Sequence, residues 1–240
     1  MKTVNATTVT QLFAEMKKAY GTHYVDKRNA DEMRIVANFL DQIGVMDKGK
    51  FLERCATTIG HKIYLPFTPG GENFLLISQV LICAHEHQHV VVMEREGAAL
   101  YNTLYVLSPS IRALYEAECY RADMEVFWWY SRAVLGKAHL LSPASLAVQL
   151  HSYGCSEKDI AVAKVSLEKA AEVVRMGGVS CRAAQNVIRF FGWNTEAPMR
   201  AVHNLADVPK KVARGKVEKK APKKAVKKAP ARAAKKARKS

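Results

Sequence analysis

The segment from residue 74 to residue 89 constrains the fold most, because it is too apolar for a surface and yet ends in ionisable side chains. Its first part, FLLISQVLICA (residues 74–84), leaves a helix without a polar face, so a helix here must be buried. We expect it to run from about Asn73 to Glu94. The run HEHQH (residues 85–89) follows inside the same helix. Buried ionisable groups need partners, and a metal ion is the natural partner of closely spaced histidines.

The spacing within HEHQH (residues 85–89) indicates how such an ion is held. His85 and His89 are four residues apart and therefore share one helix face, where both imidazoles can point at one ion. Glu86 lies about 100° round the same helix, close enough to accept a proton from a water on that ion. His87 points away from this pair, and we expect it to be an ordinary, partly exposed histidine.

A catalytic zinc ion needs a third protein ligand. The extended pattern HExxHxxGxxH is absent, because Val92 and Arg95 occupy its Gly and third His positions. The following helix offers Glu116 and Glu118. Glu118 lies on an apolar stripe, where a buried carboxylate needs a reason, whereas Glu116 shares a face with charged residues and suits an exposed pair with Arg112 four residues earlier. We therefore favour Glu118 as the metal ligand.

His85-Glu86-x-x-His89, followed on a second helix by Glu118 within EAECYRADM (residues 116–124), resembles the gluzincin class of zinc metallopeptidases. The resemblance covers roughly residues 50–135 and is closest to small HExxH proteins encoded by bacteriophages. It implies that His85, His89 and Glu118 bind Zn²⁺, that Glu86 is the general base, and that an extended substrate binds along a strand that precedes the helix. Thr57 to Leu65 (TTIGHKIYL) is the predicted strand.

The sequence departs from the gluzincin pattern after Glu118. Members often carry an acidic residue four positions after the ligand glutamate, where it orients a histidine. That position is Ala122 here, and Asp123 is one step late, so we expect Asp123 to be a surface acid. The residue that stabilises an oxyanion stays unassigned, and each candidate is more simply structural: Tyr101, Tyr105, Tyr115, His139 and His151.

The positive charge of the chain is confined to its C-terminus. The net charge is +15, but residues 209–240 carry 12 Lys and 3 Arg against Glu218 alone, so residues 1–208 are nearly neutral at +1. The tail has no leucine and no aromatic residue and contains two Ala-Pro steps, so it cannot bury enough apolar area to fold. We predict a folded domain over residues 1–208 and a disordered tail over residues 209–240.

The composition of the tail resembles the Lys/Ala/Pro tails of linker histones, which implies non-specific affinity for nucleic acid and nothing about fold. Such a tail binds polyanions by releasing counterions, with steep salt dependence. The alternative is a solubilising tail that meets nucleic acid incidentally. The lysines expected to make the contacts are Lys210, Lys211, Lys219, Lys220, Lys223, Lys224, Lys227, Lys228, Lys235 and Lys236.

The rest of the chain reads as mostly helical, in the α+β class, with a short strand or small sheet before the HExxH helix. The periodicity predicts further helices at residues 9–20, 31–43, 49–55, 108–134, 143–152, 157–175 and 181–191. Residues 98–107 are ambiguous between a strand and an irregular loop. Ser108-Pro109 and Ser156 with Asp159 are typical helix starts.

The five cysteines are odd in number and form no CxxC pair, which argues against a disulfide framework and against a cysteine zinc site. No signal sequence or membrane-spanning run is visible, so we expect a cytoplasmic protein, associated with the nucleoid or placed in a host cytoplasm if a phage encodes it.

These features favour a zinc peptidase that acts on a protein or peptide and is held near nucleic acid by its tail. A second hypothesis is a non-enzymatic, histone-like DNA-binding or packaging protein, or a phage structural protein, with a structural or decayed metal site. In a third, the peptidase processes a phage structural or host protein and the tail only concentrates it on DNA.

Overall fold

The computed structural model describes residues 1–42 and 47–193, and the whole basic tail lies outside these described residues. The described part is mostly helical with one small sheet, as the sequence predicts. The helices are α1 (Ala6–Tyr20), α2 (Asp31–Gln42), α3 (Lys48–Arg54), α4 (Leu76–Glu96), α5 (Ala98–Leu107), α6 (Pro109–Val134), α7 (Pro143–Val148), α8 (Glu157–Arg175) and α9 (Arg182–Phe191), with 3-10 helices η1 (Lys27–Asn29) and η2 (Gln149–Tyr153).

The sheet differs from the prediction of one strand over residues 57–65. That segment forms a hairpin of β2 (Thr57–Ile59) and β3 (Lys62–Leu65), which turns at Gly60 with a φ of 62° that glycine adopts without strain. The strand β1 (His23–Asp26), which the sequence analysis missed, pairs in parallel with β3. The strand order is β1-β3-β2, so β2 is an edge strand among the described residues.

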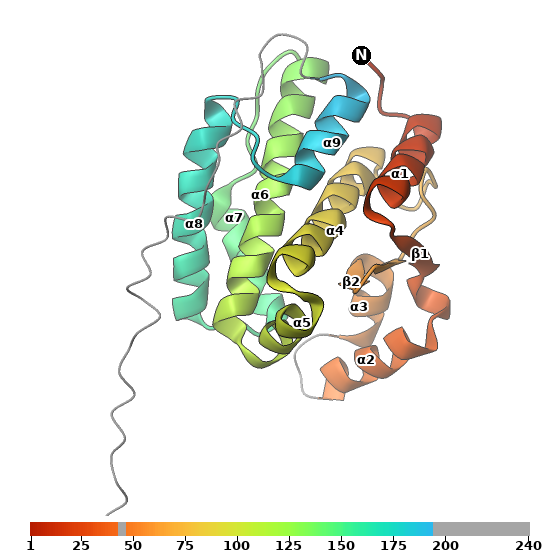
Figure 1. Ribbon diagram of the computed structural model, residues 1–240, viewed down its shortest axis with the longest axis vertical. Helices are drawn as coiled ribbons and strands as arrows, with labels where there is room; N and C mark the ends of the chain where they lie inside the picture. The colour runs from red at the N-terminus through yellow and green to blue at the C-terminus, as the bar shows by residue number, and fades with distance from the viewer. Residues whose placement is uncertain (43–46, 194–240) are drawn as a thin grey trace, which may run out of the picture. The chain divides into compact units, whose positions relative to one another are not determined.

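The helices α4 and α6 pack against each other in the middle of the described domain (Figure 1). The helices α1 and α9 pack on α4, whereas α7 and α8 pack on α6 and build a second apolar cluster there. Residues 98–107, which the sequence left open between strand and loop, form the helix α5 directly after Gly97. Because α4 and α6 have neighbours on several sides, neither helix shows one simple apolar stripe.

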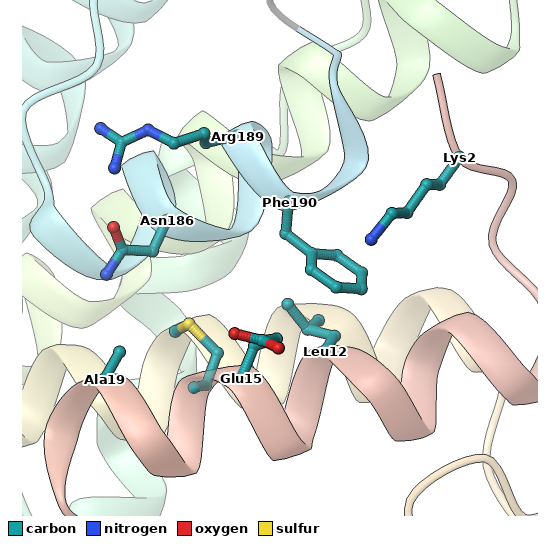
Figure 2. Close-up of a pocket in the computed structure, with 8 residues that line it drawn as sticks. Lys2, Leu12, Glu15, Ala19, Asn186, Arg189 and Phe190 are labelled. Atoms are coloured by element: carbon teal, nitrogen blue, oxygen red, sulfur yellow. The ribbon is translucent and has the colours of Figure 1, made fainter.

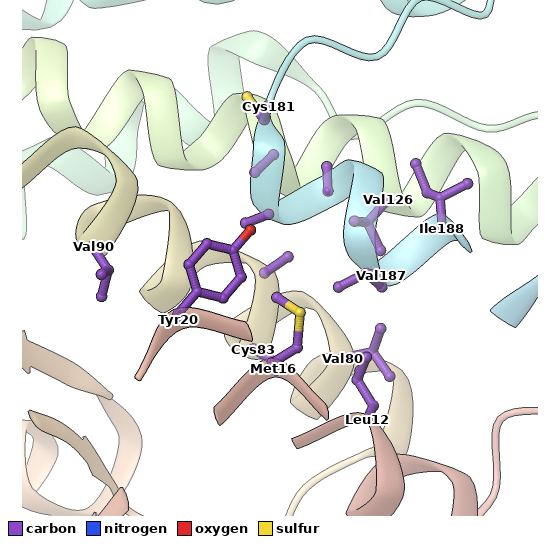
Figure 3. Close-up of a cluster of buried hydrophobic side chains, with 14 of the residues drawn as sticks. Leu12, Met16, Tyr20, Val80, Cys83, Val90, Val126, Cys181, Val187 and Ile188 are labelled. Carbon is purple, nitrogen blue, oxygen red and sulfur yellow. The ribbon is translucent and has the colours of Figure 1, made fainter. Parts of the chain in front are cut away.

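The main apolar core lies between α1, α4 and α9 (Figure 3). Leu12 and Met16 from α1 meet Val80 from α4 and Val187 from α9, and all four side chains are at most 2% exposed. This packing explains why the α4 sequence is apolar on every side, and it confirms the prediction of a buried helix. The same packing places the HEHQH segment in the interior rather than at a surface.

Cys83, Cys119, Cys155 and Cys181 are free thiols, which agrees with the expectation that no disulfide framework holds the fold. Within residues 1–42 and 47–193, no helix combines the length and the apolar composition needed to cross a membrane.

A buried carboxylate ties α9 to α6. Glu125 is fully buried and accepts hydrogen bonds from the backbone N–H of Ser180 at 3.0 Å and of Cys181 at 2.9 Å, just before α9 begins. Cys181 is the N-cap of α9 and supplies no side-chain cap, so Glu125 satisfies donors that would otherwise be orphaned. The buried Arg121 completes the group, with its Nε 2.9 Å from Glu125.

We expect Glu125→Ala to destabilise the domain by about 3–5 kcal/mol, because it leaves the buried Arg121 without a counter-charge. Equilibrium unfolding in urea at pH 7 measures this difference. Glu168→Ala is the matched control, since Glu168 forms an exposed pair with Lys164 at 3.6 Å and its loss is expected to change stability by about 0.5 kcal/mol or less. A loss below about 1 kcal/mol for Glu125→Ala would contradict the structural role of this carboxylate.

Candidate metal centre

The two histidines of the HExxH motif lie in the middle of α4 and face α6. His85 and His89 are 8% and 6% exposed, and their ring centroids are 5.0 Å apart. The Nε2 atom of His85 lies 3.3 Å from one carboxylate oxygen of Glu116, and the Nε2 atom of His89 lies 3.5 Å from the other. Two imidazole nitrogens from α4 and one carboxylate from α6 therefore converge at one point.

These distances fit a shared metal ion. Ligand atoms that bind zinc tetrahedrally at 2.0–2.1 Å are separated from one another by about 3.3 Å. Glu116 Oε2 is buried and has no hydrogen-bond partner among the described residues, so it is an acceptor that still needs a positive neighbour. A cation between the imidazoles and Glu116 would satisfy this oxygen.

The contact of His85 with Asp123 supports the same conclusion. The Nδ1 atom of His85 lies 2.9 Å from Asp123 Oδ2, and Asp123 is 8% exposed. When Nδ1–H donates to Asp123, the Nε2 atom of a neutral His85 is a bare acceptor that faces another acceptor, Glu116. Burial lowers the pKa of His85, but the carboxylates of Asp123 and Glu116 outweigh it and raise that pKa well above its ordinary value. The site thus favours a cation, and in the absence of a metal a proton binds to His85.

The prediction that Asp123 is a surface acid is therefore wrong. The prediction compares the direction of Asp123 with that of Glu118, and these two side chains diverge. Asp123 instead lies seven residues after Glu116, which is almost two full turns along the same face of α6. Asp123 acts on His85 as an orienting carboxylate, a role usual for acids beside metal-binding histidines. Tyr101 has the matching place at His89, with its hydroxyl 2.9 Å from Nδ1.

The structure places Glu118 away from the histidines, against the sequence-based preference. Its carboxylate receives two hydrogen bonds from Arg95, at 2.9 and 3.0 Å, and one from Gln88 at 2.9 Å. Most of the apolar stripe of α6 does face inward, with Ala122 and Val126 0% exposed. At its N-terminal end, however, Leu114 is 40% exposed, and Glu118 there pairs with Arg95. Of the two candidate ligands, Glu116 is the one that is fully buried, against the expectation that it is exposed.

Glu86 is positioned by the sheet. Its Oε2 accepts a hydrogen bond from Thr58 Oγ1 at 2.6 Å, and Glu86 is 6% exposed. Thr58 belongs to the edge strand β2, so the strand and the HExxH helix meet at this carboxylate. The position next to His85 on α4 keeps Glu86 beside the ion site without making it a ligand.

Cys119 also belongs to this cluster. His85, His89 and Cys119 form a buried group whose potential ligand atoms lie within 4.8 Å of one another, and such a group could hold a metal ion. Sequence spacing did not indicate this thiol, because it has no partner in a CxxC pair. Its sulfur lies 3.2 Å from Nδ1 of His89, the nitrogen on the side of Tyr101. Burial and then the nearby carboxylate of Glu116 raise the pKa of Cys119. We favour Glu116 as the third ligand because its two oxygens lie beside both Nε2 atoms, whereas the sulfur of Cys119 lies beside Nδ1 of His89.

His87 points away from the site, as predicted, but it is fully buried rather than partly exposed. Its Nδ1–H donates to the carbonyl of Cys83 at 2.7 Å, and Thr22 Oγ1 lies 3.1 Å from Nε2. Burial lowers the pKa of His87 to about 4, so it is a neutral core residue.

The residues considered for oxyanion stabilisation separate into two groups. Tyr101 contacts His89, the hydroxyl of Tyr105 donates to Glu116, and Tyr115 stacks on Tyr101 with ring centroids 4.8 Å apart. His151 pairs instead with Glu157 at 3.5 Å and is half exposed, and His139 is exposed near the end of α6. The three tyrosines belong to the metal centre, and the two histidines do not.

A cavity of about 300 Å³ opens elsewhere, between α1 and α9 (Figure 2). Leu12 and Met16 lie at its apolar side, and Lys2, Glu15 and Arg189 supply charged groups. None of its lining residues belongs to the cluster around His85 and His89. The ionisable chemistry is thus concentrated between α4 and α6 rather than in this cavity.

No protein-family model, no curated protein and no solved structure matches the chain.

We expect Glu116→Gln to weaken zinc binding at least about 100-fold, because it removes the ligand charge, and Asp123→Asn to weaken it about 10–100-fold as an orienting residue. Competitive titration with a chromophoric chelator measures both. Glu118→Gln is the matched control on the same helix and is expected to keep wild-type affinity. The opposite ranking of Glu116 and Glu118 would contradict the assignment.

Proposed function

We propose that the domain is a zinc-dependent peptidase in which His85, His89 and Glu116 hold the ion and Glu86 is the general base. The observation that carries this proposal is the convergence of both Nε2 atoms on the buried carboxylate of Glu116, whose Oε2 atom has no hydrogen-bond partner among the described residues. Zinc is the metal that suits two imidazoles and one carboxylate, a ligand set that leaves its fourth position open for water or substrate.

Bound zinc would supply two effects there, a lowered pKa of a water molecule and polarisation of a substrate carbonyl. Glu86 would accept the proton of the attacking water and pass it to the leaving amine. Thr58 fixes one oxygen of Glu86, which leaves the other oxygen for the proton. With the ion bound, Nδ1–H of His85 would donate to Asp123 and Nδ1–H of His89 would donate to the hydroxyl of Tyr101, which leaves both Nε2 atoms for the ion.

The edge strand β2 favours a peptide over other amide substrates. Extended peptides bind by adding a strand to a sheet edge, and β2 meets the general base through Thr58. The backbone of such a peptide would run beside Glu86, with its scissile bond within reach of the water. This role for β2 matches what the resemblance to gluzincins implies.

We expect Glu86→Gln to lower casein hydrolysis by about 10²–10⁴-fold and to leave zinc stoichiometry unchanged, because the general base is lost and the ligands are kept. Dye-labelled casein and zinc analysis on the full chain provide the two readouts. Glu94→Gln is the matched control, since Glu94 is an exposed residue of the same helix. Hydrolysis at the wild-type rate in Glu86→Gln, or a folded wild type without zinc, would refute the peptidase.

The C-terminal tail supports a second part of the proposal, that the enzyme is held near nucleic acid. Fifteen cations within residues 209–240 suit a polyanion, and non-specific binding by counterion release needs no folded surface. The rival function, a histone-like or structural protein with an idle metal site, rests on the same tail. The two differ in whether Glu86 matters for biological function.

Deleting residues 209–240 is expected to abolish binding to random-sequence DNA at low salt and to leave casein hydrolysis unchanged. For the full chain, we expect log K against log salt concentration to have a slope steeper than about −5, as many phosphate contacts require. Fluorescence anisotropy over a salt series measures the slope. A truncated chain that still binds DNA would place the interface in the folded domain.

A further inference from the structure

Lys27 is a buried ammonium that the proposed chemistry does not use. It follows β1 directly, lies in η1, and has no exposed surface. Lysine is almost never fully buried unless its charge is compensated, because removing an ammonium from water is costly. Its position close to the HExxH helix therefore needs an explanation.

The contacts of Lys27 lie where α3 ends and β2 begins. Its Nζ donates to the carbonyl of Cys55 at 2.8 Å and to Thr57 Oγ1 at 2.7 Å, and it lies 3.4 Å from the ring centroid of Phe51. Cys55 is the C-cap of α3, a place that favours a cation. One side chain thus fixes the end of α3 and the first residue of β2.

The strand that Lys27 fixes is short. β2 contains three residues, and β3 is its neighbour in the sheet. The residue after Thr57 is Thr58, whose hydroxyl donates to Glu86 Oε2 at 2.6 Å. An unbroken path of contacts therefore leads from the buried ammonium through Thr57 and Thr58 to Glu86.

We propose that Lys27 is a positioning residue, which clamps the start of β2 and so holds Thr58 against the carboxylate of Glu86. The proposal rests on the proposed function, because its value lies in keeping a general base aimed. Burial lowers the pKa of Lys27 to about 8, while the thiol of Cys55 and the carboxylate of Glu86 act to raise it.

A purely structural lysine and a positioning lysine respond differently to replacement. Lys27→Met keeps the apolar stem of the side chain and removes the cost of burying an ammonium, which offsets the loss of its two hydrogen bonds, so this variant is expected to keep the fold. A positioning role predicts a loss of kcat in this variant without a loss of stability. Thr57→Val removes the same contact from the other side and serves as a second variant.

The test uses the full chain loaded with zinc, dye-labelled casein as substrate, and hydrogen exchange of the β2 amides. For Lys27→Met we expect kcat to fall at least about 10-fold with KM within about twofold, as is usual when an orienting partner is lost. Zinc stoichiometry stays unchanged, and exchange at Thr58 and Ile59 accelerates at least about 10-fold. The double variant with Thr57→Val is expected to be no worse than Lys27→Met alone, because both remove one contact.

Tyr64→Phe is the matched control, because it removes a 2.8 Å hydrogen bond to Glu32 from the neighbouring strand β3 and leaves β2 untouched. It is expected to keep both kcat and the exchange of Thr58. Wild-type kcat and wild-type exchange in Lys27→Met would overturn the clamp, and if that variant does not fold, Thr57→Val decides by the same readouts. A zinc-loaded wild type that leaves casein intact would refute the peptidase instead, and the exchange of Thr58 would still decide the clamp.

Discussion

The candidate site is built around a carboxylate that is removed from water and lies against two imidazoles. Glu116 is fully buried, and the imidazoles of His85 and His89 lie 3.3 and 3.5 Å from its oxygens. In an interior that excludes water, a carboxylate needs a positive or hydrogen-bonding partner, and a cation between these groups would supply one. The packing of α4 on α6 holds the three side chains together in the centre of the domain.

The surrounding residues support our proposal that a metal ion lies between these groups. Asp123 and the hydroxyl of Tyr101 each contact the Nδ1 atom of one histidine and leave both Nε2 atoms directed at one point. The buried His87 differs in that it donates to the carbonyl of Cys83 and contacts the hydroxyl of Thr22, neither of which is a carboxylate. Glu86 adds a carboxylate that is held by Thr58 beside the ion site. The donor set and the base together resemble a hydrolytic centre.

The sequence predicted much of this arrangement, because its strongest signals are local. The helix α8 has the predicted bounds, since Ser156 with Asp159 forms the capping box that the sequence indicates. The HExxH spacing likewise placed His85 and His89 on one face. The third ligand depends on which side of α6 faces α4, and α6 is buried on several sides, so helical periodicity chose Glu118 where the packing presents Glu116.

The other differences also arise from tertiary contacts. The strand β1 has four residues and exists through its pairing with β3, a contact that the local sequence does not encode. Asp123 shares a face of α6 with Glu116 and not with Glu118, so its contact with His85 follows from the side of α6 that packs on α4. The contact of Lys27 with β2 could not be predicted from local patterns either, because Lys27 and Thr57 are thirty residues apart in the chain. Local patterns thus predict helices and motifs, whereas pairing between segments decides the ligands.

X-ray absorption at the zinc edge of the zinc-loaded full chain tests the central claim most directly. Our account predicts a first shell of nitrogen and oxygen at about 2.0–2.1 Å, with imidazole scattering from two histidines and no sulfur. A sulfur neighbour at about 2.3 Å would show that Cys119 takes the place assigned to Glu116 and would contradict the account.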